Sequence, residues 1–200
     1  MARKVEVVPM SETFYKWTFE GKPVYGTGTY DFSGAWQPRI TGELESCRRG
    51  YHVCRKDQIP SCCGDGLHQV EVDKTDMIVG ETKCVASTWR LIRTLAWSRH
   101  DMLDYAEWCL DRTRKYVPSC TSYCDWSFRM GLTAHSPGIA HSAARQAVHA
   151  ANYAGSHSND VTRCGTDDFA FEAGWDAERK AQLDWIMARI AENQPKVTRC

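Results

Sequence analysis

The order of strand-like and helix-like segments constrains the fold of this 200-residue chain more than any other feature. Thr13–Phe19 is dense in aromatic and β-branched residues, Leu67–Asp73 alternates apolar and polar residues, and Lys83–Ile92 continues in a strand-like pattern. Helical spacing begins only at Ser98, so strand and helix signals do not alternate as βαβ units require. We therefore predict an α+β protein with a mainly antiparallel N-terminal sheet, followed by about three packed helices.

The same change in pattern predicts the domain organisation. We expect a β-rich domain at residues 1–95 and a helical region at residues 96–200, with the helices packed on the sheet as one unit. Within the β-rich domain, His68, Val70 and Val72 should share one face of a strand, because side chains alternate along an extended chain.

Capping signals mark the expected helices. Ser98 and Asp101 have the spacing of a capping box, and the helix that they begin should end before Pro118. A second helix should begin at Ser136-Pro137, which places a capping residue before a proline at the first helical position. Thr166 or Asp167 can cap a long last helix. Its apolar stripe includes Trp175, Leu183, Ile186 and Ile190.

Charge and hydropathy exclude several classes of function. Lysine plus arginine equals aspartate plus glutamate, at 25 each, so no global field favours a polyanionic partner. The first twenty residues lack the apolar run of a signal peptide, and no later run approaches the length of a membrane span. We expect a cytoplasmic protein without a membrane partner, whose ten cysteines are mostly free thiols.

Cysteine and histidine residues concentrate between Cys47 and His68, where 22 residues hold four cysteines and two histidines. A structural zinc site usually takes its ligands as two close pairs, and that spacing is poor here. The favoured interpretation is structural and without a cofactor: Gly50 allows a turn that leads into a strand, and Cys54 and Cys84 fill strand interiors. Zinc is kept as the alternative. Its ligands would come from His52, Cys54, Cys62, Cys63 and His68.

Two further arrangements of these residue types have a chemical interpretation. Cys47 could act as a nucleophile if a turn brought it to His52, although the sequence indicates no third, orienting group. His141, Arg145 and His149 share the face of the second helix opposite its alanines. Eight residues of helix separate the two histidines by about 12 Å, which is too far for one metal ion. That face is therefore interpreted as solvated or as a partner surface.

Several segments together resemble known families. "CRRGYHVC", "HQVEVD" and "KCVASTWRLIRTLAW" are similar to an uncharacterised family of bacteriophage and actinobacterial proteins. "LDYAEWCLDRTRKYV", "AARQAVHAANYA" and "FEAGWDAERKAQLDWIMARI" resemble the alanine- and tryptophan-rich helical region of putative immunity proteins. The two resemblances span Phe14 to Ile190. They imply a phage-type origin, hence a host-cell cytoplasm, and an architecture of strands leading into helices.

The favoured function is non-covalent binding of a host or phage protein, of the immunity, host-takeover or anti-defence type, without chemistry of its own. Weak binding candidates are Trp175, Trp185 and the face formed by His141, Arg145 and His149, since tryptophan and arginine are common at interface hot spots. Each tryptophan has core packing as its alternative interpretation.

Two alternative functions belong to other classes. Tyr51 and His52 resemble the aromatic-histidine pair on the nicotinamide-site strand of ADP-ribose transferases, which implies a nucleotide-binding enzyme on the β-rich half. Such an enzyme would need a catalytic glutamate, for which only Glu71 or Glu107 can be nominated. The segment "RRGYHVCRK" interleaves cations with Tyr51, a combination that can bind nucleic acid.

Overall fold

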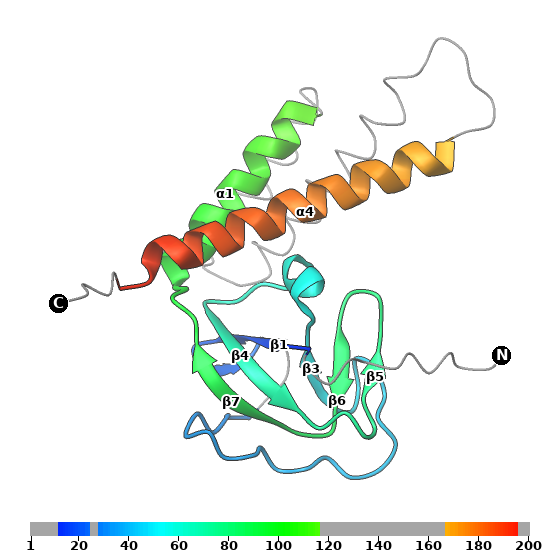
Figure 1. Ribbon diagram of the computed structural model, residues 1–200, viewed down its shortest axis with the longest axis vertical. Coiled ribbons are helices and arrows are strands. Elements are labelled where there is room, and N and C mark those ends of the chain that lie inside the picture. The colour runs from blue at the N-terminus through cyan, green and yellow to red at the C-terminus, as the bar shows by residue number, and fades with distance from the viewer. Residues whose placement is uncertain (1–11, 25–27, 117–166, 196–200) are drawn as a thin grey trace. The chain divides into compact units, whose positions relative to one another are not determined.

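The computed structural model describes residues 12–24, 28–116 and 167–195, which fall into two compact units (Figure 1). The described residues up to Ile59 form the first unit together with Gly66–Leu95. Pro60–Asp65 joins the described residues from Ala96 onwards in the second unit. Strands make up the first unit and the long helices belong to the second, so the fold is α+β, as the order of the sequence signals predicts.

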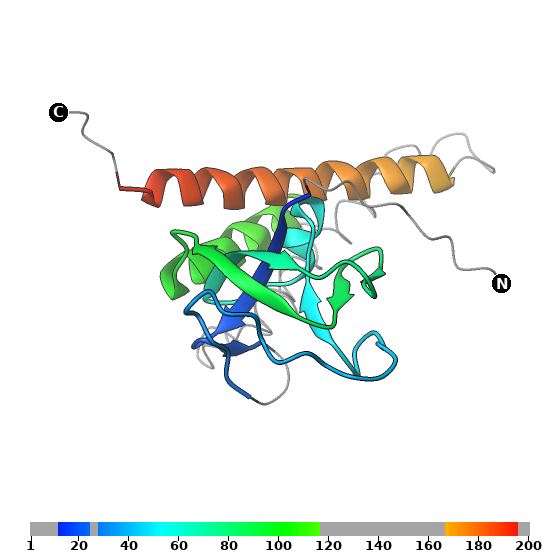
Figure 2. The same ribbon diagram turned by 60° about the horizontal axis from the view of Figure 1, so that its bottom comes forward.

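Four strands of the first unit form an antiparallel sheet in the order β2-β1-β4-β7. Their bounds are Phe14–Phe19 (β1), Lys22–Pro23 (β2), Gly66–Val72 (β4) and Trp89–Thr94 (β7). Because β4 pairs with β1 on one side and β7 on the other, β2 and β7 are the edges of this sheet (Figure 2). The strands predicted at Thr13–Phe19 and within Leu67–Asp73 are thereby confirmed.

A second, three-stranded sheet has the order β3-β6-β5 and is also antiparallel. Its strands are Tyr51–Val53 (β3), Ile78–Val79 (β5) and Cys84–Ala86 (β6), and the 3₁₀ helix η1 (Lys56–Ser61) follows β3. The strand-like pattern predicted over Lys83–Ile92 corresponds to two strands, β6 and β7, rather than to one. Ser87 and Thr88 separate β6 from β7, because their polar groups bond instead to the segment of residues 37–40.

The core of the first unit lies on one face of the four-stranded sheet. Phe14, Val70, Val72 and Trp89 are buried there with residues of the second sheet. His68 is buried on the same face of β4 as Val70 and Val72, which confirms the predicted alternation along this strand. Cys54 and Cys84 are buried, as predicted for cysteines that act as small apolar side chains.

In the described part of the second unit, two long helices follow the short segment Pro60–Asp65. Helix α1 (Arg99–Tyr116) begins as predicted: the Ser98 backbone N–H donates to Asp101 Oδ2 at 2.8 Å, and the Asp101 N–H donates to Ser98 Oγ at 3.3 Å. Helix α4 (Asp167–Asn193) starts at one of the two predicted capping positions. The helix predicted from Ser136 lies outside the described residues. Within the described ranges, neither helix is long and apolar enough to cross a membrane.

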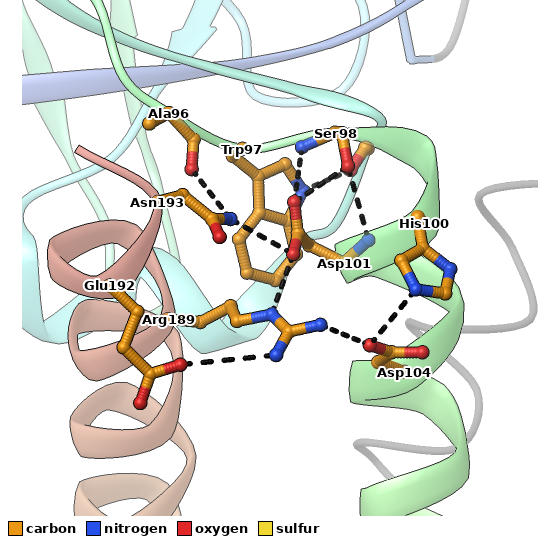
Figure 3. A network of polar contacts seen from close by, with 10 residues as sticks. Ala96, Trp97, Ser98, His100, Asp101, Asp104, Arg189, Glu192 and Asn193 are labelled. Atoms are coloured by element: carbon orange, nitrogen blue, oxygen red, sulfur yellow. Dashed lines mark hydrogen bonds and ion pairs between the residues drawn. The ribbon is translucent and has the colours of Figure 1, made fainter. Parts of the chain in front are cut away.

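Paired charges join α1 to α4 near both ends of their contact. Near the start of α1, Arg189 of α4 donates to Asp101 Oδ1 at 2.7 Å and also bonds to Asp104 (Figure 3). Further along α1, the Arg112 guanidinium bonds to both carboxylate oxygens of Glu178, at 2.6–2.9 Å. The start of one helix therefore lies beside the end of the other. The two pairings together are compatible only with helices that run in opposite directions.

Candidate functional site

The predicted helical surface lies mostly outside the described residues. This applies to His141, Arg145 and His149, and to the side chain of Trp175, although the backbone at Trp175 belongs to α4. Trp185 is described, and its half-buried ring lies 5.5–6.2 Å from the rings of three aromatic residues of the same unit. These are Trp97, Tyr105 and Trp108. Trp185 therefore contributes to the contact between α1 and α4, as its alternative interpretation requires.

The five candidate zinc ligands have separate structural environments. Both ring nitrogens of His68 are bonded to threonine hydroxyls, Nε2 to Thr18 at 2.9 Å and Nδ1 to Thr94 at 3.1 Å. Burial and the charge of Lys16 lower the pKa of His68 to about 4, so its ring is neutral at pH 7. Cys54 donates its thiol hydrogen to the carbonyl of Tyr15 at 3.5 Å.

Cys62 and Cys63 belong to the second unit. Cys63 is buried, and burial raises its pKa well above the ordinary thiol value, so it is a neutral thiol rather than a thiolate ligand. Across the described ranges, no group of three or more His, Cys, Asp or Glu side chains is placed to hold a metal ion. His52, Cys54, Cys62, Cys63 and His68 are thus not brought together as a metal centre.

Tyr51 and His52 project to opposite sides of β3, since they are neighbours on an extended strand. The Tyr51 ring packs 6.5 Å from the ring of Trp89, and its hydroxyl donates to the carbonyl of Pro38 at 2.9 Å. His52 Nε2 accepts the backbone N–H of Cys47 at 3.2 Å. The turn therefore does bring Cys47 to His52, but the imidazole bonds to the backbone of Cys47 and not to its thiol.

The cations of "RRGYHVCRK" are partly neutralised by neighbouring carboxylates. Arg48 forms an ion pair with Glu45 at 3.1 Å, and Arg55 lies 3.6 Å from Asp57 and 4.0 Å from Glu12. This segment therefore offers fewer free charges for a phosphate backbone than its sequence suggests.

The most exposed large apolar side chains of the described residues lie along β7. Ile92 is 53% exposed, and Trp36, which forms an isolated β-bridge with Arg90, is 42% exposed. Ile92 occupies a β-bulge: Leu91 pairs with Val70 and Arg93 with Gln69, so Ile92 has no residue opposite it on β4. The bulge turns an apolar side chain toward solvent in a strand that is otherwise regular.

The outer edge of β7 is covered along only part of its length. The backbone N–H of Gln37 donates to the Trp89 carbonyl at 2.8 Å, and the N–H of Ile40 donates to the Ser87 carbonyl at 2.9 Å. These bonds cover the chain up to the Trp36–Arg90 bridge. Beyond it, no strand among the described residues pairs with the outer side of residues 92–94. Alternate backbone groups of an edge strand point away from its neighbour, so those of residues 92–94 that no described strand pairs with could bond to a further strand.

Two arginines complete the surface, which we call the β7 edge patch: Trp36, Arg90, Ile92 and Arg93. The Arg90 guanidinium lies 5.1 Å from the centre of the Trp36 ring and bonds twice to Glu71, at 2.6 and 2.8 Å. Arg93 Nε donates to the Gln69 side chain at 2.7 Å. Within the described chain Arg93 has no carboxylate partner, so its charge is available to a bound molecule.

Sequence reasoning did not find this patch. The letters "RLIR" indicate a strand. In a regular strand successive side chains lie on alternate faces, so this pattern does not predict the bulge at Ile92. Adjacent apolar residues Leu91 and Ile92 are the visible signal of an irregularity. Only the pairing with β4 shows that Leu91 faces the core while Ile92 is exposed.

Comparisons with protein-family models, with curated proteins and with solved structures found no match to this chain. Function is therefore inferred from the placement of its own residues.

Proposed function

We propose that the chain acts by non-covalent binding of another protein, in the manner of a phage accessory protein of the immunity, host-takeover or anti-defence type. The partner, a host or phage protein, would add an extended segment to the open end of β7. The observation that supports this proposal most directly is that Trp36 and Ile92 are exposed beside edge backbone with which no described strand pairs.

An added strand could both pair with the edge backbone of β7 and cover its exposed apolar side chains. Unpaired edge backbone can bond to the main chain of an incoming strand, which supplies affinity without depending on sequence. Side chains that alternate along the incoming strand supply specificity. An apolar side chain of the partner can cover Ile92, and full burial of a residue of this size contributes about 1.5–3 kcal/mol.

Charge complementarity specifies the partner segment further. Arg93 has a hydrogen-bond partner in Gln69 but no carboxylate within the described chain, and Arg90 is already paired with Glu71. We therefore expect the partner segment to combine apolar residues with at least one aspartate or glutamate that pairs with Arg93. Proline should be absent from the segment, because it removes a backbone donor.

The test uses the intact chain as bait in a bacterial host, with Ile92→Asp as the disrupting variant. Lys22→Asp is the matched control, since it places the same carboxylate on β2, the opposite edge of the same sheet. Quantitative mass spectrometry should find a protein that Ile92→Asp loses and Lys22→Asp keeps. With the purified partner, Ile92→Asp should weaken binding at least about tenfold, or about 1.4 kcal/mol.

Amide hydrogen exchange then locates the contact. Binding of the purified partner should slow exchange at residues 92–94 in the wild-type chain, because those groups enter a new strand pair. A partner that both edge variants bind equally would contradict the proposal. If the triple variant His141→Ala, Arg145→Ala, His149→Ala abolishes binding instead, the surface belongs to the helical region. Recovery of nucleic acid rather than protein would replace the proposal with the nucleic-acid alternative.

A further inference from the structure

A tight turn between Glu45 and Arg49 holds Cys47 away from the core. The Glu45 carbonyl accepts the N–H groups of Arg48 and Arg49, at 3.1 and 2.9 Å, and the Glu45 N–H donates to the Arg49 carbonyl at 2.9 Å. Cys47 adopts a φ of 68°, a left-handed conformation that residues other than glycine and asparagine seldom adopt. Its thiol is exposed at the surface of the first unit.

The Cys47 thiol is paired with a cation from another part of the chain. Lys83, which directly precedes β6, places its Nζ 2.8 Å from Cys47 Sγ. Ser46 Oγ lies 3.8 Å from the same sulfur. The hydrogen bond from Lys83 is the main cause that lowers the pKa of Cys47 below its ordinary value. A thiolate is stabilised by such an adjacent ammonium group, and it is the form of cysteine that reacts.

His52 stabilises the turn as a neutral residue, so the positive charge beside the Cys47 sulfur comes from Lys83. Its Nε2 accepts the Cys47 N–H, which requires an unprotonated nitrogen. Burial, together with Lys83 and Lys16, lowers the pKa of His52 to about 4, so the imidazole is neutral at pH 7. Lys16 is itself only 5% exposed and donates to the His52 carbonyl at 2.6 Å. Two lysines therefore lie near the Cys47–His52 contact, Lys83 beside the sulfur and Lys16 at the His52 carbonyl.

Three buried cysteines, Cys63, Cys84 and Cys109, show the opposite behaviour. Burial raises the pKa of Cys84 to about 11, and it also raises the pKa values of Cys63 and Cys109. Cys47 therefore combines exposure with a stabilised thiolate, and the geometry of the turn gives it a chemistry that these buried thiols lack.

We propose that Cys47 is a reactive thiolate site that forms a mixed disulfide with small disulfides bearing carboxylates. The Cys47 sulfur attacks one sulfur of the disulfide, a new sulfur–sulfur bond forms and the original one breaks. The second half of the reagent leaves as a thiolate with the bonding electron pair. Cys47 is thereby oxidised and the leaving half is reduced, without a further oxidant.

The preference for carboxylates follows from the charges around the sulfur. Lys83 loses its anionic partner when Cys47 becomes a disulfide, and a carboxylate of the attached group can take that place. Arg48 and Arg49 lie on the same turn. Arg48 forms an ion pair with Glu45 at 3.1 Å, whereas no carboxylate of the described residues forms one with Arg49. Lys83 and Arg49 are therefore the cations on which the preference for a carboxylate rests, since Arg48 is already paired with Glu45.

The experiment measures the rate of mixed-disulfide formation on the intact protein, cysteine by cysteine, by peptide mass spectrometry. Oxidised glutathione is the carboxylate-bearing probe, cystamine is a cationic probe, and free cysteine is the reference thiol. Rates are recorded from pH 5 to pH 9. The variants are Lys83→Gln, Lys83→Arg, which keeps the positive charge, and Lys22→Gln as a matched lysine replacement on β2.

Cys47 should react with oxidised glutathione with a pH midpoint below that of free cysteine. Lys83→Gln should raise this midpoint and slow the reaction at pH 7, by roughly threefold for each pH unit of the shift. That factor is smaller than the change in thiolate fraction, because a less acidic thiol is intrinsically more nucleophilic. Lys83→Arg and Lys22→Gln should keep the wild-type profile.

Three results would overturn the proposal. Cys47 could have the profile of free cysteine, or Lys83→Gln could leave the profile unchanged while circular dichroism shows a folded protein. Cystamine could also react faster than oxidised glutathione, when each is measured relative to free cysteine, and this would refute the preference for carboxylates. Because Cys47 and the β7 edge patch are separate sites, failure here leaves the proposed binding function to its own test.

Discussion

A side chain at position 50 would have no room in the turn that leads into β3. Gly50 has a φ of 132°, and a Cβ built there would lie 2.2 Å from Val85 Cγ1 in the neighbouring strand. Gly28 has a similar φ of 121°, but no heavy atom of the described residues lies within 4 Å of a Cβ built there. Gly50→Ala should therefore cost about 1–3 kcal/mol more unfolding free energy than Gly28→Ala, measured by urea denaturation. Equal losses would show that backbone strain alone acts at both positions.

His68 should make stability depend on pH between about 4 and 6.5. Its folded pKa, about 4, is below the unfolded value of 6.5, so the unfolded chain binds more protons in this range. The stabilisation is complete above pH 6.5 and is lost as the pH falls toward 4. We expect a loss of roughly 2 kcal/mol for this residue after allowance for its partial solvent contact.

The measurement is chemical unfolding at pH 7 and pH 5 for the wild-type chain and for His68→Gln. The variant should be less stable at pH 7 but should lose less stability on acidification. His52, whose pKa is also lowered to about 4, contributes a change of the same sign, so His52→Gln provides the second comparison. An unchanged pH dependence in both variants would contradict the neutral state of these rings.

Local chemistry in the sequence predicts some residues of the first unit and misses others. The burial of Cys54 and Cys84 follows from the strand pattern and the known behaviour of free thiols. The sequence allows a contact between Cys47 and His52 only if a turn brings them together, and it does not predict the geometry of that turn. The contact with Lys83 spans 36 positions and depends on how β3 and β6 pair, so no local pattern predicts it.

The ion pair between Arg112 of α1 and Glu178 of α4 should have a small net effect on the unfolding free energy. Removal of only one of its two partners should nevertheless be strongly destabilising. Glu178 is 1% exposed and bonds to Arg112 through two carboxylate oxygens. Arg112→Met would leave a buried carboxylate without this cation, at a cost of about 3 kcal/mol. The double variant Arg112→Met, Glu178→Met should recover most of that loss, because it removes both charges.

A matched control lies on the same helix. Lys180 and Asp184 also form an ion pair, at 2.6 Å, but their side chains are largely exposed. Lys180→Met should change the unfolding free energy by no more than about 0.5 kcal/mol. Thermal and urea unfolding of the variants would distinguish the two cases. Similar losses for Arg112→Met and Lys180→Met would show that burial of Glu178 is unimportant.

Elements whose signals are local were predicted better than those set by pairing. The capping box at Ser98 and Asp101 marks the start of α1 because its hydrogen bonds lie within one turn of chain. The division of Lys83–Ile92 into β6 and β7 depends on bonds from residues 37–40, which are distant in sequence. The exposure of Ile92 depends on the bulge opposite β4, and so the candidate site could not be predicted.

At the scale of the molecule, the sequence predicted the class of the fold but not the path of the chain between its units. The strand signals before residue 95 and the helix signals after it correctly indicate an α+β protein. Pro60–Asp65 nevertheless lies with the helical unit. The Gly64 carbonyl accepts the indole N–H of Trp97 at 2.9 Å, and Ser61 bonds to Arg179. These contacts join residues that are distant in the sequence, so local sequence patterns do not predict them.

Because of this path, replacement of Cys54 and replacement of Cys63 should destabilise different units. Cys54 is buried in the first unit and Cys63 in the second, although they are nine positions apart. A buried serine hydroxyl in place of a thiol should cost about 1–2 kcal/mol in each case. In amide hydrogen exchange of the intact chain, Cys63→Ser should speed exchange mainly in α1 and α4, and Cys54→Ser mainly in β1 and β4. If either replacement speeds exchange equally in both sets of elements, the two units open as one cooperative body, and the assignment of Pro60–Asp65 to a separate helical unit has no energetic meaning.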